Sequence, residues 1–253
     1  VAKNTEPFNE ALSKKGLNIE LNMLDDAFDL GVKYVTTNIA VSRLMGSGID
    51  FQYEGKTYHF NKGIVEDYDK IISAYSGKGM VVNAILLNDW SDSTSNLFIP
   101  GVEKTSSAYY YMFNATNEAG FEQLKAISAF LADHYSGKNA NYGKISNWII
   151  GNEISCQVWN YMGATDVASY VRAYQKAFRI FYTAIKSTSA NDRVYFSLDY
   201  NWNNPQEKDG KLKYGGKEIV DSFNSIANDW GQIDWGLAYH PYPCPMTEPE
   251  FWN

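Results

Sequence analysis

The sequence predicts an α/β fold of the (β/α)8 barrel type. Three observations predict it: helix and strand patterns alternate, links from helix to strand are short, and links from strand to helix are long. Alternation of this kind produces a parallel sheet with right-handed crossovers. With 253 residues, of which 45% are hydrophobic, the chain can bury a large core as one domain.

Patterns in the first part of the chain predict strands, a short helix and a hairpin. β-Branched residues favour strands, and apolar residues three and four apart before Gly31 favour a helix. Aromatic and polar residues alternate around Glu54 and Gly55, which indicates a hairpin. In order, the expected elements are an extended segment over 1–13, a strand over 15–19, a helix over 24–28, a strand over 32–40 and a hairpin over 51–60.

From residue 64 onward, a helix followed by a strand is expected four times. The apolar residues of each helix lie on one face, and Gly77 and Gly79 end the first helix. Because no glycine-rich phosphate loop follows any strand, the nucleotide-binding open sheets are disfavoured. The expected pairs are 64–75 with 80–87, 121–131 with a strand ending at Gly151, 167–185 with 193–198, and 219–230 with 234–240.

The long links follow the strands. They cover 88–116, 154–165 and 200–216, and long loops in a compact domain are usually functional. We therefore expect the functional site at the carboxyl end of the strands, as in a (β/α) barrel.

The count of strands falls short of a closed barrel. About six of the eight β/α units of such a barrel are recognisable. Either residues beyond Asn253 complete the barrel, or the sheet is an unusual open one. We favour the first and expect residues 1–253 to form a single barrel domain that is incomplete at its C-terminal end.

Charge and hydropathy argue against nucleic acid and the membrane interior as partners. The 29 acidic and 22 basic residues give a net charge of -7, which is unsuited to holding a phosphate backbone. No stretch reaches the roughly 18 to 20 apolar residues of a membrane span, and no leader sequence opens the chain, so a processed start is expected at Val1. Cys156 and Cys244 are too few for a disulfide scaffold; they could pair in a secreted protein, but two free thiols are expected.

Aromatic residues are abundant outside the apolar runs. They make up 15% of the chain, with 19 Tyr and 7 Trp, many beside Asn, Gly and Ser. Such rings suit flat ligands with polar rims, of which sugars are the commonest, although packing explains most single rings equally well. The rings expected in loops after strands are Trp90, Trp159, Tyr161, Trp202 and Trp252.

A short apolar run ends at Gly151 and is followed by Asn152 and Glu153 at the end of the fourth expected strand. Here the sequence resembles the clan A glycoside hydrolases, eight-stranded barrels with an Asn-Glu pair at this place. The resemblance extends to His240-Pro241-Tyr242 after the sixth strand, and the pattern is closest to a family of uncharacterised secreted bacterial barrel proteins. It implies that Glu153 is the general acid/base, that Asn152 binds a sugar hydroxyl, and that His240 and Tyr242 line the sugar site.

Cleavage of a glycosidic bond requires a second carboxylate, about 5 to 5.5 Å away in retaining enzymes. The resemblance places this nucleophile on a seventh strand, which by our count begins after Asn253. Asp199, at the end of the fifth strand, is the best substitute within the chain, although a carboxylate bound to loop amides is the equally good alternative. Glu248 and Glu250 are expected in solvent.

The remaining candidates are weaker. We expect six more residues, at strand ends and in loops, to contact substrate hydroxyls or sugar rings: Asn38, Asn88, Asp89, Asp199, Trp90 and Trp202. His59 and His134 are expected to be structural or at the surface. No set of His, Asp and Glu has metal-ligand spacing, so neither metal nor cofactor is expected.

The sequence thus predicts a glycoside hydrolase, of the retaining type, that acts on a poly- or oligosaccharide with Glu153 as general acid/base. One alternative is a barrel that binds carbohydrate without cleaving it, and another is an open α/β protein without a sugar ligand. Secretion, or a location at the cell surface or in the periplasm, is expected, and the sequence does not determine the oligomeric state.

Overall fold

The computed structural model describes residues 1–203 and 210–242, and its main sheet is parallel throughout. The order along the sheet is β1-β2-β5-β6-β7-β8, so each strand pairs with the strand of this sheet that follows it in the chain. This sequential order is that of a (β/α) barrel, and the sheet is part of such a barrel, as predicted. The strands are β1 (Gly16–Asn18), β2 (Tyr34–Ala40), β5 (Val81–Leu87), β6 (Asn147–Ile150), β7 (Arg193–Leu198) and β8 (Gly236–Tyr239).

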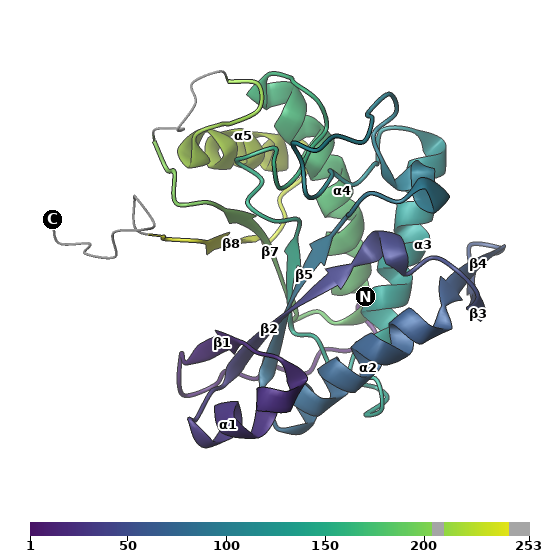
Figure 1. Ribbon diagram of the computed structural model, residues 1–253, viewed down its shortest axis with the longest axis vertical. Helices are drawn as coiled ribbons and strands as arrows, with labels where there is room; N and C mark the ends of the chain where they lie inside the picture. Colours follow the sequence, from purple (N-terminus) through teal and green to yellow (C-terminus); the bar gives the residue numbers. More distant parts are fainter. Residues whose placement is uncertain (204–209, 243–253) are drawn as a thin grey trace, which may run out of the picture.

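Helices alternate with these strands, and α2, α3 and α4 all lie on the same side of the sheet (Figure 1). Asn61, Asn117 and Asp166 cap α2, α3 and α4, because each side chain accepts a hydrogen bond from a backbone N–H three residues further on. The α-helices are α1 (Leu24–Asp29), α2 (Lys62–Gly77), α3 (Glu118–His134), α4 (Val167–Thr188) and α5 (Gly216–Asp229), and short 3-10 helices cover Leu21–Met23, Val41–Arg43 and Asp92–Leu97.

The predicted hairpin is present, between β2 and α2. Strands β3 (Gly48–Tyr53) and β4 (Lys56–Asn61) are antiparallel and form a sheet of their own. Glu54 and Gly55 both have positive φ, 48° and 78°, as a tight turn of the hairpin type requires. The Phe60 ring of β4 stacks on Phe130 of α3 at 3.9 Å, so the hairpin packs against the helical layer.

The core lies between the strands and the helices. Alternate strand residues such as Val82, Trp148 and Phe196 are fully buried against α3, α4 and α5. Three aromatic residues of the expected apolar helix patterns are exposed, not buried: Phe28, Phe121 and Trp230. Phe121 is 43% exposed, and Trp230 is 38% exposed with its ring beside the Arg172 guanidinium at 5.5 Å.

Polar residues form a row on the other face of the sheet. Asn147 donates to Asn83 at 2.8 Å, and Asn83 donates to Thr36 at 3.3 Å, across three neighbouring strands. These residues are in register, and their side chains alternate with the buried apolar ones. This face of the sheet therefore carries a row of hydrogen-bonded polar side chains.

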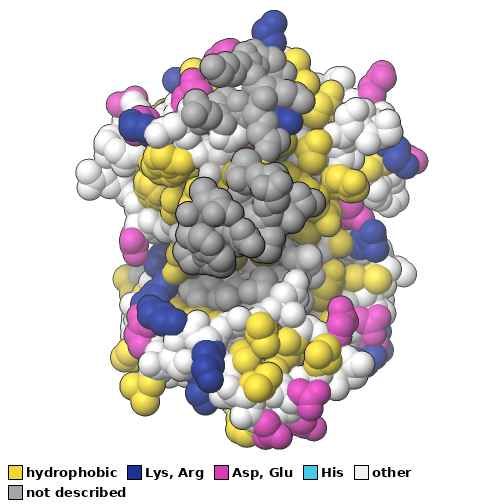
Figure 2. Space-filling model, turned by 60° about the vertical axis from the view of Figure 1, so that its left-hand side comes forward, with side chains coloured by type: hydrophobic (Ala, Val, Ile, Leu, Met, Phe, Trp, Pro, Cys, Tyr) yellow, Lys and Arg dark blue, Asp and Glu magenta, His cyan; other side chains and the backbone are white. Residues whose placement is uncertain are grey.

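Long loops follow the strands, as the sequence indicates: residues 88–117, 151–166 and 199–215 connect β5 to α3, β6 to α4 and β7 to α5. On the face shown in Figure 2, Lys and Arg side chains are interspersed with Asp and Glu. Within the described part of the chain, no helix is long and apolar enough to cross a membrane.

Candidate functional site

The Glu153 backbone has an uncommon conformation at the carboxyl end of β6. Its φ is +40°, in the left-handed region that L-residues rarely adopt, and Gly151 just before it has φ +75°. The Glu153 amide donates to the Ser197 hydroxyl at 2.8 Å, and the Ile154 amide donates to the Ser197 carbonyl at 3.0 Å. The end of β7 therefore holds the turn that positions Glu153.

The Glu153 side chain pairs with His240. The Nδ1 atom of His240 lies 2.7 Å from Oε1 of Glu153, although the two residues are 87 positions apart. Their side chains are 23% and 11% exposed, respectively. The carboxyl ends of β6 and β8 thus bring together an acid and an imidazole, and the ring restricts the orientation of the carboxylate.

Glu153 lines a cavity of about 330 Å³ between the loops after β6 and β7. Trp159 and Tyr242, two of the rings expected near the site, are in its wall. So is Tyr200, which follows Asp199 in the chain. Asp199 also lines it, so two carboxylates share the cavity. The complete lining is Glu153, Ser155, Cys156, Trp159, Asp199, Tyr200, Asn201, Lys213, Tyr214 and Tyr242.

Burial changes the acidity of two groups in this cavity. Desolvation raises the pKa of the Asp199 carboxyl; the Asn201 amide, which donates at 3.0 Å, and the Ser155 hydroxyl oppose the rise, and the negative charge of Glu153 adds to it. Desolvation also raises the pKa of the Cys156 thiol. Burial therefore favours the neutral forms of these two groups.

Hydrogen bonds within and between the two loops lie beside the cavity. The buried side chain of Gln157 donates to the carbonyls of Gly163 and Lys211 and to the Tyr214 hydroxyl, and it accepts from the Met162 amide. The Tyr214 amide donates to the Ser155 carbonyl at 2.9 Å. The loops after β6 and β7 are thus joined beside the candidate site.

Several predicted site residues lie elsewhere. Asn88 is 1% exposed and donates to the carbonyls of Leu97 and Met112, so its amide supports the loop after β5. Asp89 accepts from the side chains of Ser42 and Arg43 and joins the ends of β2 and β5.

The other candidates have varied surroundings. Trp90 stacks on Phe98 at 4.6 Å, and Trp202, which is 37% exposed, lies edge-on to the Tyr239 ring. Asn152 is half-buried beside Glu153, and Asn38 is exposed on β2. Tyr161 packs its ring edge against Tyr111, His59 pairs with Asp50 at the surface, and His134 pairs with Asp69 between α3 and α2. Trp252, Cys244, Glu248 and Glu250 lie outside the described residues.

Sequence reasoning missed Ser197, Ser155 and Lys213. Ser197 is fully buried in β7, and a serine within a strand has no pattern that marks it as a partner of a residue 44 positions away. Ser155 and Lys213 belong to loops whose course the sequence does not reveal. The signal that could have found Ser197 is its place one residue before the end of β7, on the strand beside Glu153.

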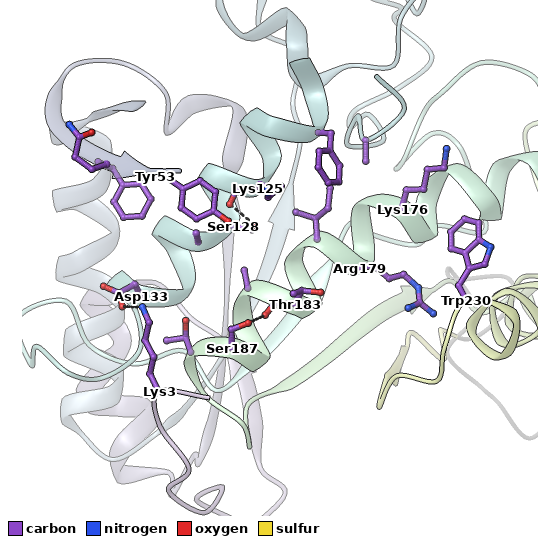
Figure 3. A pocket seen from close by; sticks show the side chains of 18 residues that line it. Lys3, Tyr53, Lys125, Ser128, Asp133, Lys176, Arg179, Thr183, Ser187 and Trp230 are labelled. Carbon is purple, nitrogen blue, oxygen red and sulfur yellow. Dashed lines mark hydrogen bonds and ion pairs between the residues drawn. The ribbon is translucent and has the colours of Figure 1, made fainter. Parts of the chain in front are cut away.

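A larger cavity, of about 900 Å³, lies on the outer surface between α3 and α4 (Figure 3). Lys125 and Ser128 of α3 and Arg179 and Thr183 of α4 line it. None of the predicted site residues is in its wall, and it lies on the helical side of the sheet, away from the strand ends. We therefore assign the site to the smaller cavity. Among the described residues, no group of three or more His, Cys, Asp or Glu side chains could hold a metal ion.

A protein-family model matches nearly the whole chain. Residues 7–253 match the model of a family of unknown function, DUF5722. The chain belongs to this family. Its description gives neither source nor location, so secretion and bacterial origin remain predictions. A comparison with curated proteins gives no match.

Solved structures similar to the chain include a family 1 β-glucosidase from Thermotoga maritima, with 15% identity and a TM-score of 0.44 over 81% of this chain and 41% of that one. An endo-β-1,4-mannanase from Thermotoga petrophila has 18% identity and a TM-score of 0.48 over 83% and 50%. An intracellular xylanase from Thermoanaerobacterium saccharolyticum has 15% identity and a TM-score of 0.47 over 88% and 62%. The chain thus spans 41% to 62% of these proteins' lengths, and at these values the likeness carries no conclusion about the reaction.

Proposed function

We propose that this chain contributes the acid/base half of a glycoside hydrolase site, with Glu153 as the proton donor. The observation that carries the proposal is the buried Glu153 carboxyl group at the carboxyl end of the fourth strand of the sheet, paired with His240 and lining a cavity with an aromatic wall. Carboxylic acids in such cavities protonate leaving-group oxygens in glycosidases.

The proposed chemistry follows from the surroundings of the acid. Glu153 gives its proton to the glycosidic oxygen as the bond to the anomeric carbon breaks, and in a retaining reaction it then removes a proton from the attacking water. His240 at Oε1 restricts the carboxyl group, and the Ser197 hydroxyl holds the backbone that carries it. The opposing nucleophile is expected on a further strand of the barrel, beyond Asn253.

We expect the substrate to be a poly- or oligosaccharide. Asn152 beside Glu153 supports this expectation as a donor and acceptor for a sugar hydroxyl, and Trp159 and Tyr242 do so as rings in or at the cavity wall. Secretion to the medium or cell surface fits a polymeric substrate.

A carbohydrate-binding barrel without activity is the second candidate. It is favoured by Asp199, the other described carboxylate of the cavity, which accepts from the Asn201 amide and so is already engaged by its loop. Binding of saccharides without cleavage by the unaltered protein would support it.

The test is hydrolysis of a panel of aryl glycosides and polysaccharides by the full-length protein and its Glu153→Gln variant. We expect the substitution to lower kcat by about 10² to 10⁴, the usual contribution of a general acid. Glu66→Gln, on the solvent side of α2, is the matched control and should be unchanged. Equal rates for Glu153→Gln and the unaltered protein would overturn the assignment.

A further inference from the structure

The loop after β5 adds exposed aromatic surface to the candidate site. Tyr109 is 67% exposed, the most of any tyrosine among the described large hydrophobic residues. Its ring stacks on Trp159 at 4.9 Å with an interplanar angle of 18°. Because Trp159 lines the Glu153 cavity, aromatic surface continues from the cavity to the solvent.

Backbone hydrogen bonds fix this pair of rings. The Tyr109 amide donates to the Val158 carbonyl at 2.8 Å, and the Tyr161 amide donates to the Tyr110 carbonyl at 2.9 Å. The segment around Tyr109 is therefore joined to the segment around Trp159 on both sides of the stacked rings. The pair is preorganised, so little conformational freedom is lost when a ligand covers it.

We propose that Tyr109 and Trp159 form a binding surface for the part of a saccharide chain that extends beyond the Glu153 cavity, so that the protein prefers long chains. The proposal rests on the proposed function in one respect, since the occupant of the cavity is taken to be a sugar. At about 330 Å³ the cavity is at the small end of ligand pockets, which run from ~300 to 1,000 Å³. Units beyond the first few must therefore lie outside it, and the exposed Tyr109 ring, supported by Trp159, presents a flat apolar face to the C–H faces of those units.

The charge of this region agrees with a neutral sugar chain. Of the two carboxylates in the cavity wall, Asp199 is opposed by the positive charge of Lys213, and Glu153 is paired with His240. Recognition therefore depends on ring contacts and hydroxyl hydrogen bonds, and we expect it to be insensitive to salt.

The experiment compares chain lengths. Retention in native gels containing soluble β-glucan, glucomannan or arabinoxylan is measured for the full-length protein in the Glu153→Gln background, so that no polymer is cut. Hydrolysis of hexasaccharides and of aryl monosaccharide glycosides is measured in the otherwise unaltered protein. Tyr109→Ala should weaken polymer binding and lower kcat/KM for hexasaccharides by about 3- to 10-fold, the value of one aromatic contact, and leave aryl glycosides within 2-fold.

Two controls separate ring loss from general damage. Tyr109→Phe keeps the stacked ring and should behave as the parent, and Trp230→Ala removes a partly exposed ring from the helical side. Equal retention of the parent and Tyr109→Ala, or failure of the parent to bind any polymer, would overturn the proposal that this surface binds a saccharide chain. Polymer binding that depends on Tyr109 without any hydrolysis would support the surface and refute the catalytic function.

Discussion

Replacing Asp192 with asparagine tests the electrostatics of the fold away from the candidate site. Asp192 lies just before β7, at the opposite end of that strand from Asp199, and is 4% exposed. It accepts a hydrogen bond from the Trp148 indole at 3.4 Å. Burial raises the pKa of its carboxyl group from 3.8 to about 6, against the opposing charges of Lys144 and Lys186.

The direction of the effect follows from this shift. A carboxyl whose pKa is higher in the folded state binds its proton more tightly there, so its contribution to stability is fully present below about pH 4 and is lost as the pH rises through about 6. The shift of about two units corresponds to roughly 3 kcal/mol. Asparagine keeps an oxygen for the indole N–H and carries no charge. The Asp192→Asn variant should therefore be more stable by about 2 to 3 kcal/mol at pH 7.5, or roughly 5 to 10 °C in Tm.

Urea unfolding followed by tryptophan fluorescence at pH 4, 5, 6 and 7.5 measures the difference in unfolding free energy between the variant and the unaltered protein. The stability gained by the variant should be near zero at pH 4 and should grow between pH 4 and pH 7. Asp221→Asn, which removes an exposed partner of Lys217 on α5, is the control and should change stability by less than about 1 kcal/mol at every pH. A gain that does not vary with pH, or a loss at pH 7.5, would refute the reasoning.

Two further substitutions test hydrogen bonds that hold local structure. Ser197→Ala leaves the buried Glu153 amide without its acceptor, so we expect a loss of about 1 to 3 kcal/mol in unfolding free energy and a fall in kcat that exceeds any change in KM; unchanged kcat would show that the turn does not depend on this bond. Asn117→Ala removes the cap of α3, where the side chain accepts from the Gly120 amide at 2.9 Å, and should cost about 1 kcal/mol in a thermal melt without altering kcat; an unchanged Tm would contradict the capping role.

The fold could be predicted because its determinants are local. The strict spacing of apolar residues in α2 and α4, and the β-branched run of β2, indicate each element without knowledge of its neighbours. Phe121 and Trp230 show where this reasoning ends. Both continue an apolar helix pattern, but no other element of the described chain buries them.

The candidate site was predictable only in part, because it depends on contacts between distant residues. Strand ends at Glu153, Asp199 and His240 could be read from the pattern, and these residues do meet at one edge of the sheet. The structural role of Asn88 could not be predicted, because it depends on how the following loop folds back over this residue. Ser197 was missed for the related reason that its role depends on the neighbouring strand.

The most direct test of the central claim, that Glu153 protonates the leaving group, is the dependence of Glu153→Gln on leaving-group acidity. The kcat/KM ratio of unaltered protein to variant is measured for aryl glycosides from dinitrophenyl to unsubstituted phenyl. A departing phenolate of low pKa needs little protonation, so the ratio should rise from below about 10 for dinitrophenyl to about 10² or more for phenyl. A ratio that is the same for every leaving group would contradict the assignment of Glu153 as the general acid.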